Sequence, residues 1–435
     1  MDWRPRRITA EEAATKIQSN QRIFVTGNCS IPQKFVQALR DYHENLHAVE
    51  LVQLLDLGVG DYITADMCEH ININSLFISG KVRKAINEGK GDFTPIFLHE
   101  IPQLFRNGRL TLDVAVIHVS PPDEHGYCSY GVEVGVSKSA AESAKVIIAE
   151  VNQQMPRALG DSFIHISKID YFIEVDYPLL EIHPEPPSPV QDRIANYIAE
   201  LIPDGATLQT GIGGIPDAVL RRLTNHRDLG IHTELFSDGV MEMIERGVIT
   251  NAAKNLHTGK VIAGFVLGTE KLYRYIDDNP IFEFHPTEYV NDPFIVSQND
   301  RMISINSALE IDLTGQVCAD SIGTKFYSGV GGQVDFVRGA SRSKGGKSFI
   351  ALPSTAKDDT INRIVPMLKP GASVTTSRND VRYVVTEYGV ADLYGRTIAE
   401  RATALINIAH PKFRDELTAF AKKENYIGHV YAKGC

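Results

Sequence analysis

Short apolar segments alternate with amphipathic segments along most of the chain. The apolar segments are no more than eight residues long and are typical of buried strands; they cover residues 49–55, 113–119, 145–151, 260–267, 302–306, 349–352, 374–376 and 381–387. Between them, residues 238–249 and 397–409 show the apolar spacing of one helical face. Strands that alternate with helices predict an α/β fold of mainly parallel sheets, covered on both faces. Such sheets bind ligands at the carboxyl ends of their strands.

Two parts of the sequence resemble each other. Residues 24–39 read FVTGNCSIPQKFVQAL and residues 208–223 read LQTGIGGIPDAVLRRL, so T-G-x-x-x-I-P recurs at an offset of 184 (210 − 26). A second pair, DEHGYC from Asp123 and DLTGQVC from Asp312, recurs at an offset of 189 (312 − 123). The common order predicts duplication of one unit, in which a strand and a tight glycine turn lead into a helix with Pro at its first position. We therefore expect two related, open, mainly parallel α/β domains.

A proline-rich segment separates the two copies. Residues 181–194 read EIHPEPPSPVQDRI and contain four prolines, so we expect neither a regular helix nor a central strand there. Such spacers are extended and semi-rigid. The sequence thus predicts one domain over residues 1–186 and a second over residues 187–435.

Composition and charge exclude several classes of protein. The 435 residues include 44 Lys and Arg against 54 Asp and Glu, a net charge of −10, and 43% are hydrophobic. This composition predicts a folded globular protein, and the negative charge argues against non-specific binding to nucleic acid or to an anionic membrane. No segment approaches the roughly 18 apolar residues of a membrane span, and no apolar segment follows the first arginines as it would in a secretory signal.

Cysteine and histidine positions bear on the compartment and on metal binding. The five cysteines are scattered and form no C-x-x-C pair: Cys29, Cys68, Cys128, Cys318 and Cys435. This pattern fits a reducing cytoplasm and predicts neither a disulfide framework nor a zinc site. The 14 histidines show no H-E-x-x-H or similar spacing, so we expect no metal.

The first candidate site is QTGIGGIP, residues 209–216. Gly211, Gly213 and Gly214 allow a ligand to approach the backbone, and the helix N-terminus that follows favours an anion. The spacing is neither G-x-G-x-x-G nor that of a P-loop, so neither familiar nucleotide site is supported. A simple strand-to-helix turn is an equal alternative.

The second candidate site is GIHTELFSDGVMEMI, residues 230–244. Its alternation predicts a strand that ends near Glu234, followed by a helix that Asp238 is placed to cap. A solvated carboxylate is the commoner role for an isolated Glu at a strand end. For His232 we favour a hydrogen bond to a backbone carbonyl over the role of catalytic base.

The third candidate site is SGVGGQVDFVRGASRSKGGK, residues 328–347. Gly329, Gly331 and Gly332 are dense enough to form a nest of backbone N–H groups for an oxyanion. A basic run follows that would suit a polyanion such as a nucleotide phosphate, with a solvated loop as the alternative; it consists of Arg338, Arg342, Lys344 and Lys347.

Other nucleophiles and bases find less support in the sequence. In SPPDEHGYCSYG, residues 120–131, Glu124 and His125 invite an acid/base interpretation, but a turn held by Asp123 is favoured. No G-x-S-x-G elbow is present, so Glu remains the candidate nucleophile beside an oxyanion nest.

Several of these segments together resemble the acetyl-CoA hydrolase/transferase family of the class I CoA-transferases. The matching segments, in the family's order, are SPPDEHGYCSYG, QTGIGGIPDAV, HTELFSDG, EYVNDPF, INSALEIDLTGQV and SGVGGQVDFVRGA. The last segment and HTELFSDG look most like 4-hydroxybutyrate CoA-transferases and butyryl-CoA:acetate CoA-transferases. Gln333-Val334 differs from the pair usual in the succinyl-CoA:acetate branch. The resemblance implies two open α/β domains, in agreement with the repeat.

The resemblance also implies roles for individual residues. Glu234 matches the family's catalytic Glu, which becomes a covalent CoA thioester, and Gly331 and Gly332 match its oxyanion loop. The positions expected to contact CoA are Gly211, Ile212, Gly213, Gly214, Ile215, Asn291, Asn306, Gly329, Gly331 and Lys344. Of these, Lys344 belongs to the basic run, which is not a family motif.

The implied activity is transfer of CoA between acetyl-CoA and a short-chain carboxylate, 4-hydroxybutyrate or butyrate, by a ping-pong mechanism. The enzyme would act as a cytoplasmic homodimer with no cofactor except CoA, its substrate and covalent intermediate. The alternative enzyme is an acyl-CoA hydrolase that uses the same Glu. A non-enzymatic alternative is a sensor of CoA or of a sugar phosphate on the same fold.

Overall fold

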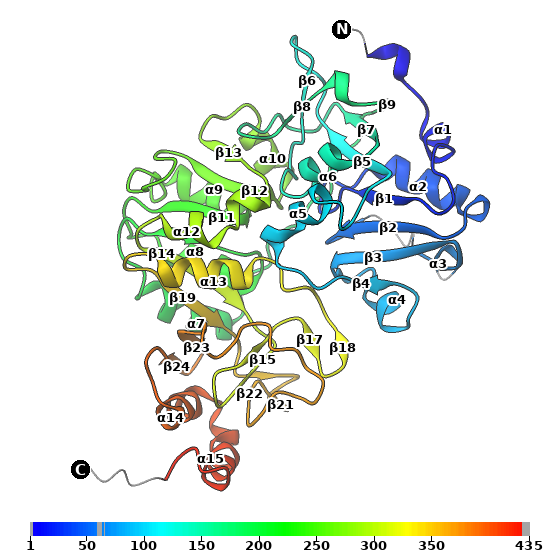
Figure 1. The fold of residues 1–435 in the computed structure, drawn as a ribbon. Coiled ribbons are helices and arrows are strands. Elements are labelled where there is room, and N and C mark those ends of the chain that lie inside the picture. The colour runs from blue at the N-terminus through cyan, green and yellow to red at the C-terminus, as the bar shows by residue number, and fades with distance from the viewer. Residues whose placement is uncertain (1–2, 59–62, 65, 429–435) are drawn as a thin grey trace.

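A parallel sheet lies at the centre of each half of the chain (Figure 1). The computed structural model describes residues 3–58, 63–64 and 66–428. The seven strands of the first sheet are, in spatial order, β4 (Asp92–Phe93), β3 (Ile71–Phe77), β2 (Val49–Leu54), β1 (Arg22–Val25), β5 (Val114–Val119), β7 (Val146–Asn152) and β9 (Tyr171–Val175). All of their pairings are parallel.

The second sheet repeats this arrangement. Its strands are, in spatial order, β13 (Phe282–Phe284), β12 (Val261–Val266), β11 (Gly230–Phe236), β10 (Thr207–Gln209), β14 (Met302–Ser307), β19 (Lys347–Ala351), β23 (Tyr383–Thr386) and β24 (Gly389–Asp392). Its first seven strands follow one another along the chain in the same order as those of the first sheet, with β10 in the place of β1. The additional edge strand β24 is antiparallel to β23. The equal strand order confirms two related, mainly parallel α/β units.

The second repeated pair, DEHGYC and DLTGQVC, forms two similar turns that are held by their aspartates. Asp123 Oδ1 accepts hydrogen bonds from the backbone N–H groups of His125 and Tyr127, at 2.9 and 2.8 Å. Asp312 Oδ1 accepts them from Thr314 and Gln316, at 2.9 and 3.1 Å. Both aspartates thus bond to the residues two and four positions later, and a short strand follows each turn, β6 (Tyr127–Ser129) and β16 (Val317–Cys318).

Helices cover the faces of the sheets. In the first half they are α1 (Ala10–Ala14), α2 (Gln33–Tyr42), α3 (Met67–His70), α4 (Arg83–Asn87), α5 (Ile101–Arg106) and α6 (Ser137–Ser143). In the second half they are α7 (Pro189–Ala199), α8 (Gly214–Arg222), α9 (Asp238–Glu245), α10 (Glu270–Ile276), α11 (Thr287–Val290), α12 (Pro293–Ser297), α13 (Gln333–Arg342) and α14 (Ile398–Ile408), and α15 (Arg414–Lys423) packs on α14.

The proline-rich segment differs from its prediction at one end. Residues 189–194 are helical, because Pro189 is the first residue of α7 and Ser188 caps it, with its hydroxyl accepting from Gln191 N–H. Proline is tolerated there, since the first helical N–H has no partner within the helix. The domain boundary between residues 186 and 187 stays a prediction.

Three smaller expectations about local structure are also wrong. The prolines of the repeat do not occupy the first helical position: Pro32 precedes α2 and Pro216 is the third residue of α8. Asp238 does not cap α9, since its carboxylate accepts from Thr269 instead. Residues 374–376 form no strand, and only Thr376 makes an isolated bridge, to Val317.

A region of short strands lies beside the second sheet, at the bottom of Figure 1. A three-stranded sheet joins β15 (Glu310–Asp312) to β16 and to β22 (Ile364–Val365). Two antiparallel pairs accompany it, β17 (Ser321–Ile322) with β18 (Lys325–Phe326) and β20 (Thr355–Ala356) with β21 (Ile361–Asn362). Helical and strand periodicity is weak over such short elements, so the sequence did not predict them.

The two halves share one hydrophobic core. A single cluster of buried residues runs from Ile117 in β5 to Val385 in β23. Backbone hydrogen bonds also cross between the halves: Val266 N–H donates to Val132 O, and Gly135 N–H donates to Gly264 O, both at 3.0 Å. The two halves are therefore packed directly against each other.

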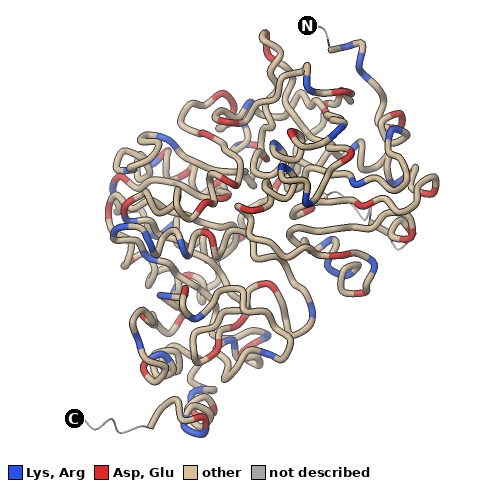
Figure 2. Tube along the Cα trace, in the orientation of Figure 1, with Lys and Arg blue, Asp and Glu red and all other residues tan. Residues whose placement is uncertain are grey.

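Charge is spread evenly over this fold. Lys and Arg are interspersed with Asp and Glu along the trace in Figure 2. No helix in the described ranges has both the length and the apolar character needed to cross a membrane.

The first glycine turn generates a test of the packing. A Cβ at Gly27 would lie 1.9 Å from Leu54 O in β2, so Gly27→Ala must push two strands apart. We expect it to destabilise the protein by about 1–3 kcal/mol, the usual cost of overpacking. Gly80→Ala is the matched control, because no atom lies within 4 Å of its Cβ. Thermal unfolding of both variants checks this, and equal melting temperatures would contradict it.

Candidate active site

Glu234 lies near the carboxyl end of β11, in the interior of the second sheet. Its side chain is partly exposed, whereas the preceding three residues of the strand are buried. Its Oε2 accepts a hydrogen bond from Asn291 Nδ2 at 3.1 Å. Asn291 is fully buried at the end of α11. The predicted carboxylate and the predicted Asn are therefore in direct contact.

The glycine loop before α13 closes against the same carboxylate. A Cβ at Gly332 would lie 2.1 Å from Glu234 Oε2 and 2.3 Å from Asn291 Nδ2, so only glycine fits. Gly331 has a φ of +56°, which also favours glycine. Because Gly332 immediately precedes a ten-residue helix, the positive end of the helix dipole lies at the carboxylate.

The surroundings change the acidity of Glu234. Burial raises the pKa of Glu234 to about 7, and the negative charge of Asp335 also raises it. The hydrogen bonds from Asn291 and from the backbone of Gly332 act in the opposite direction and lower this pKa. The carboxyl group is thus poised between its neutral and charged forms near neutral pH, as is common at reactive sites.

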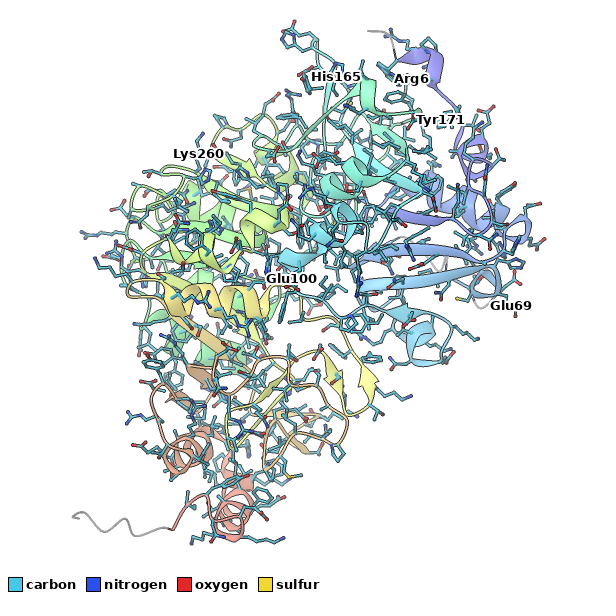
Figure 3. All side chains as sticks on the ribbon, in the orientation of Figure 1. Arg6, Glu69, Glu100, His165, Tyr171 and Lys260 are labelled. Atoms are coloured by element: carbon cyan, nitrogen blue, oxygen red, sulfur yellow. The ribbon has the colours of Figure 1, made fainter. Side chains whose placement is uncertain are left out.

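The first half of the chain contributes to this site. His99 Nδ1 lies 2.7 Å from Asp335 Oδ1, and His99 N–H donates to Asp335 Oδ2 at 3.3 Å. Asp335 is 1% exposed, and burial raises its pKa. Figure 3 labels Glu100, the neighbour of His99, near the junction of the two halves. His99 was not predicted, because nothing in its sequence surroundings distinguishes it.

The glycine loop itself rests on the first sheet. A Cβ at Gly329 would lie 3.0 Å from the ring of Phe77, and one at Gly331 would lie 3.1 Å from the same ring. Leu98 N–H donates to Gly331 O at 3.3 Å. Residues from β3 and from the segment before α5 thus hold the loop against Glu234. Sequence spacing gave no signal for these contacts.

The other glycine loop, Gly211 to Ile215, leads from β10 into α8. Gly213 is exposed, has a φ of +112° and directly precedes the helix, where no side chain caps the first N–H groups. Thr233, the neighbour of Glu234, fixes the base of the loop through a hydrogen bond to Thr210 O at 2.8 Å. The loop and Glu234 therefore lie at the ends of adjacent strands, and Ile212 and Gly214 are partly exposed.

Asn306 and Lys344 have different positions relative to this site. Asn306 lies near the end of β14, where its Nδ2 donates to Gln209 Oε1 in β10 at 3.2 Å. Lys344 is exposed two residues beyond the far end of α13, a helix whose ten residues span about 15 Å from Gly332 to Arg342. The structure brings Asn306 to the carboxyl edge of the sheet but does not bring Lys344 there.

The basic run does not form one cationic patch. Arg338 pairs with Asp380, at 3.3 Å, and lies over the ring of Phe97. Lys347 is the first residue of β19, and its Nζ donates to Leu201 O at 2.7 Å. Arg342 is exposed at the last position of α13. These side chains lie in different surroundings. The structure therefore does not support the prediction that they bind one polyanion together.

The two histidines considered as catalytic bases, His232 and His125, have structural roles. His232 Nε2 lies 2.8 Å from Val290 O, and burial lowers its pKa to about 3, so the ring is neutral. The predicted carbonyl partner is confirmed. His125 is exposed on the turn that Asp123 holds, which confirms the structural interpretation of residues 120–131.

Buried polar atoms without a partner gather at the carboxyl end of the first sheet. Among the described residues, they include Asn28 after β1, Gln53 in β2, and Ser75 and Ser79 at the end of β3. These side chains are between 0% and 2% exposed. Leu76 and Phe77, between the two serines, contact Gly329, so this polar set lies beside the glycine loop.

Comparison with known proteins agrees with the resemblance seen in the sequence. Residues 1–182 match the acetyl-CoA hydrolase/transferase N-terminal domain, and residues 268–421 match the C-terminal domain of the same family. The chain is 52% identical over 427 residues to a 4-hydroxybutyrate coenzyme A transferase of Clostridium kluyveri, covering 97% of this chain and 100% of that protein.

A second relative has a different name. The chain is 48% identical to a succinyl-CoA:acetate/propanoyl-CoA:succinate CoA transferase of Fasciola hepatica, covering 92% of this chain and 84% of that one. Relatives of nearly equal identity thus carry names with different acyl-CoA substrates.

The fold has a close match among solved structures. RipA from Yersinia pestis superposes with a TM-score of 0.92 at 37% identity, covering 98% of this chain and 100% of that one. Two family domains, relatives near half identity and this superposition agree over nearly the whole chain. The chain belongs to the acetyl-CoA hydrolase/transferase family.

Proposed function

We propose that this protein is a CoA-transferase that moves CoA between acetyl-CoA and a short-chain carboxylate, 4-hydroxybutyrate or butyrate, through a thioester on Glu234. The observation that carries the proposal is the contact of Glu234 with Asn291 and with the backbone of Gly332, where a single methyl group would not fit. The name of the Clostridium kluyveri relative supports 4-hydroxybutyrate as a substrate.

The reaction needs no external acid or base. The Glu234 carboxylate attacks the thioester carbonyl of acyl-CoA, and the tetrahedral intermediate expels CoA thiolate to leave a mixed anhydride. The thiolate then attacks the glutamyl carbonyl and releases the first carboxylate, which leaves a glutamyl-CoA thioester. An incoming carboxylate reverses both steps, so every bond formed is matched by one broken.

Oxyanion stabilisation is the main task of the protein in this mechanism. Negative charge develops on a carbonyl oxygen during each addition. The Asn291 amide, the N–H groups of the Gly331–Gly332 loop and the N-terminus of α13 are donors or dipoles already in place beside Glu234. Such preorganised groups act more strongly in a site that excludes water.

The open glycine loop and the first sheet have separate roles in this proposal. The open loop from Gly211 to Ile215, with the N-terminus of α8, suits the phosphate groups of CoA. The unpartnered amide of Asn28 and the unpartnered Nε2 group of Gln53, whose Oε1 accepts from Asp56 N–H, suit the polar end of the carboxylate substrate. Lys344 has no part here, because it lies beyond the far end of α13.

Hydrolysis is the alternative outcome of the same chemistry. It differs only in whether water reaches the glutamyl thioester before a carboxylate does. The names of the relatives at 52% and 48% identity favour transfer. We further expect a homodimer in the cytoplasm, where the cysteines of the described residues, all free, remain reduced; Cys435 lies outside those residues.

A covalent label tests the proposal directly. Incubation with acetyl-CoA alone, followed by borohydride, should reduce the thioester and modify Glu234, as peptide mass mapping would show. Addition of 4-hydroxybutyrate or butyrate should discharge the thioester and protect the enzyme. Glu234→Gln should abolish transfer, and Glu234→Asp should lower it by about 100-fold, because the carboxylate retracts. His125→Ala, at an exposed turn, is the control.

Three results would contradict this assignment. The first is a label on another residue, and the second is normal transfer by Glu234→Gln. The third is release of free CoA at the same rate with and without carboxylate, which would identify a hydrolase.

The glycine contact gives a second test. Gly332→Ala should lower turnover by about 100- to 1,000-fold, the usual cost of losing an oxyanion donor, because its methyl group displaces the Glu234 carboxylate. Its melting temperature should stay close to that of the wild type and of Gly80→Ala. A folded Gly332→Ala variant with near-normal turnover would reject this role.

The acidity of Glu234 gives a third test, of pH dependence. Only the carboxylate is nucleophilic, and its pKa is about 7, so kcat/KM for acetyl-CoA should rise with pH and level off above about pH 7. Asp335→Asn removes a negative charge that raises this pKa, so the rise should move to lower pH. Asp380→Asn, which affects only the contacts of Asp380 with Arg338 and Ser377, should leave the profile unchanged. Equal profiles for all three proteins would contradict the proposed coupling.

A further inference from the structure

A cluster of two histidines and a glutamate lies outside the active site, at the edge of the second sheet. His257 belongs to the segment before β12, Glu283 lies in edge strand β13, and His285 follows that strand. One ligand atom from each side chain lies within 4.8 Å of the other two. Figure 3 labels the adjacent Lys260 at the outer side of this sheet. The proposed transferase mechanism uses none of these residues.

The geometry suits a metal ion. His257 Nδ1 lies 2.9 Å from Glu283 Oε2, and His285 Nε2 lies 3.6 Å from the same oxygen. Ligand atoms bound tetrahedrally to zinc at 2.0–2.1 Å are about 3.3 Å apart, between these two values. The three side chains are 17% to 25% exposed, so the cluster lies close to the surface, although His285 Nε2 itself is buried.

The hydrogen bonds of the two histidines leave one ring nitrogen of each available to bind a metal ion. His285 Nε2 is buried and has no hydrogen-bond partner. His257 Nε2 lies 2.6 Å from Tyr289 Oη. If Nε2–H donates to this oxygen, the Nδ1 lone pair points toward Glu283. Metal-binding histidines are typically oriented in this way by a partner of their other ring nitrogen.

The Glu283 carboxylate has one oxygen that faces the histidines and one that faces a lysine. Lys260 Nζ lies 3.7 Å from Glu283 Oε1, the oxygen that does not contact the histidines. One carboxylate oxygen therefore remains for an ion.

We propose that His257, Glu283 and His285 bind a divalent transition-metal ion, with zinc as the best match to two imidazoles and one carboxylate. The ion would join the segment before β12 to edge strand β13. Gly264 of β12 lies between this edge and Glu234, since its Cβ would be 3.2 Å from Glu234 O and 3.7 Å from His285 O. The proposal does not depend on the transferase assignment.

The test measures metal binding by the full chain and not its activity. After chelation and dialysis, wild-type protein should bind one Zn²⁺ per chain at this cluster, as measured by titration calorimetry and elemental analysis. Co²⁺ in its place should give the absorption of a four-coordinate site. His285→Gln and Glu283→Gln should each weaken binding at least 100-fold. Tyr289→Phe should weaken it about 10- to 100-fold, as expected for loss of an orienting partner.

A second cluster in the described residues supplies the matched control. His43, Asp66 and His70 also lie within 4.8 Å of one another, so His43→Gln should leave the proposed site intact. The proposal is overturned if wild type binds no zinc, if His43→Gln loses the binding, or if folded His285→Gln and Glu283→Gln keep wild-type affinity. Should one of these variants fail to fold, the other and Tyr289→Phe decide the question.

Discussion

The close contact between the Gly332 backbone and the Glu234 carboxylate is the constraint on which the rest of the site depends. It leaves no room for a Cβ at the position that begins α13, and it places the N-terminus of that helix at a carboxylate. Burial and the nearby Asp335 raise the pKa of Glu234, whereas Asn291 and Gly332 offset part of that rise. A nucleophile that is half ionised near neutral pH results from this balance.

This contact is maintained by both halves of the chain. Phe77 and Leu98 hold the glycine loop from the side of the first sheet, and His99 binds the buried Asp335. The hydrophobic core continues from one sheet into the other. Because interiors pack densely, a shift of one sheet relative to the other would be felt at Glu234. The duplicated units therefore act as one body at the site.

The two copies of the glycine turn differ in how closely they are packed. In the first copy, Gly27 is pressed against β2, and Asn28 is fully buried. In the second copy, Gly213 is exposed, with its positive φ and an uncapped helix behind it. The same strand–turn–helix unit is thus tightly packed in the first copy and partly exposed in the second. The extra glycines of QTGIGGIP account for the difference, since they admit conformations that side chains exclude.

The sequence by itself determined the α/β class, the duplication and the two glycine loops, because hydrophobic period, turn residues and repeated spacing are local properties of a chain. It also predicted the carbonyl partner of His232 and the turn at Asp123. Only the tertiary structure decided that His99 and Phe77 belong to the site, that Lys344 lies away from it, and that His257, Glu283 and His285 come together. These outcomes depend on which strands are neighbours and which helix face turns inward. Contacts between residues far apart in sequence leave no periodic signal, so packing alone settles them.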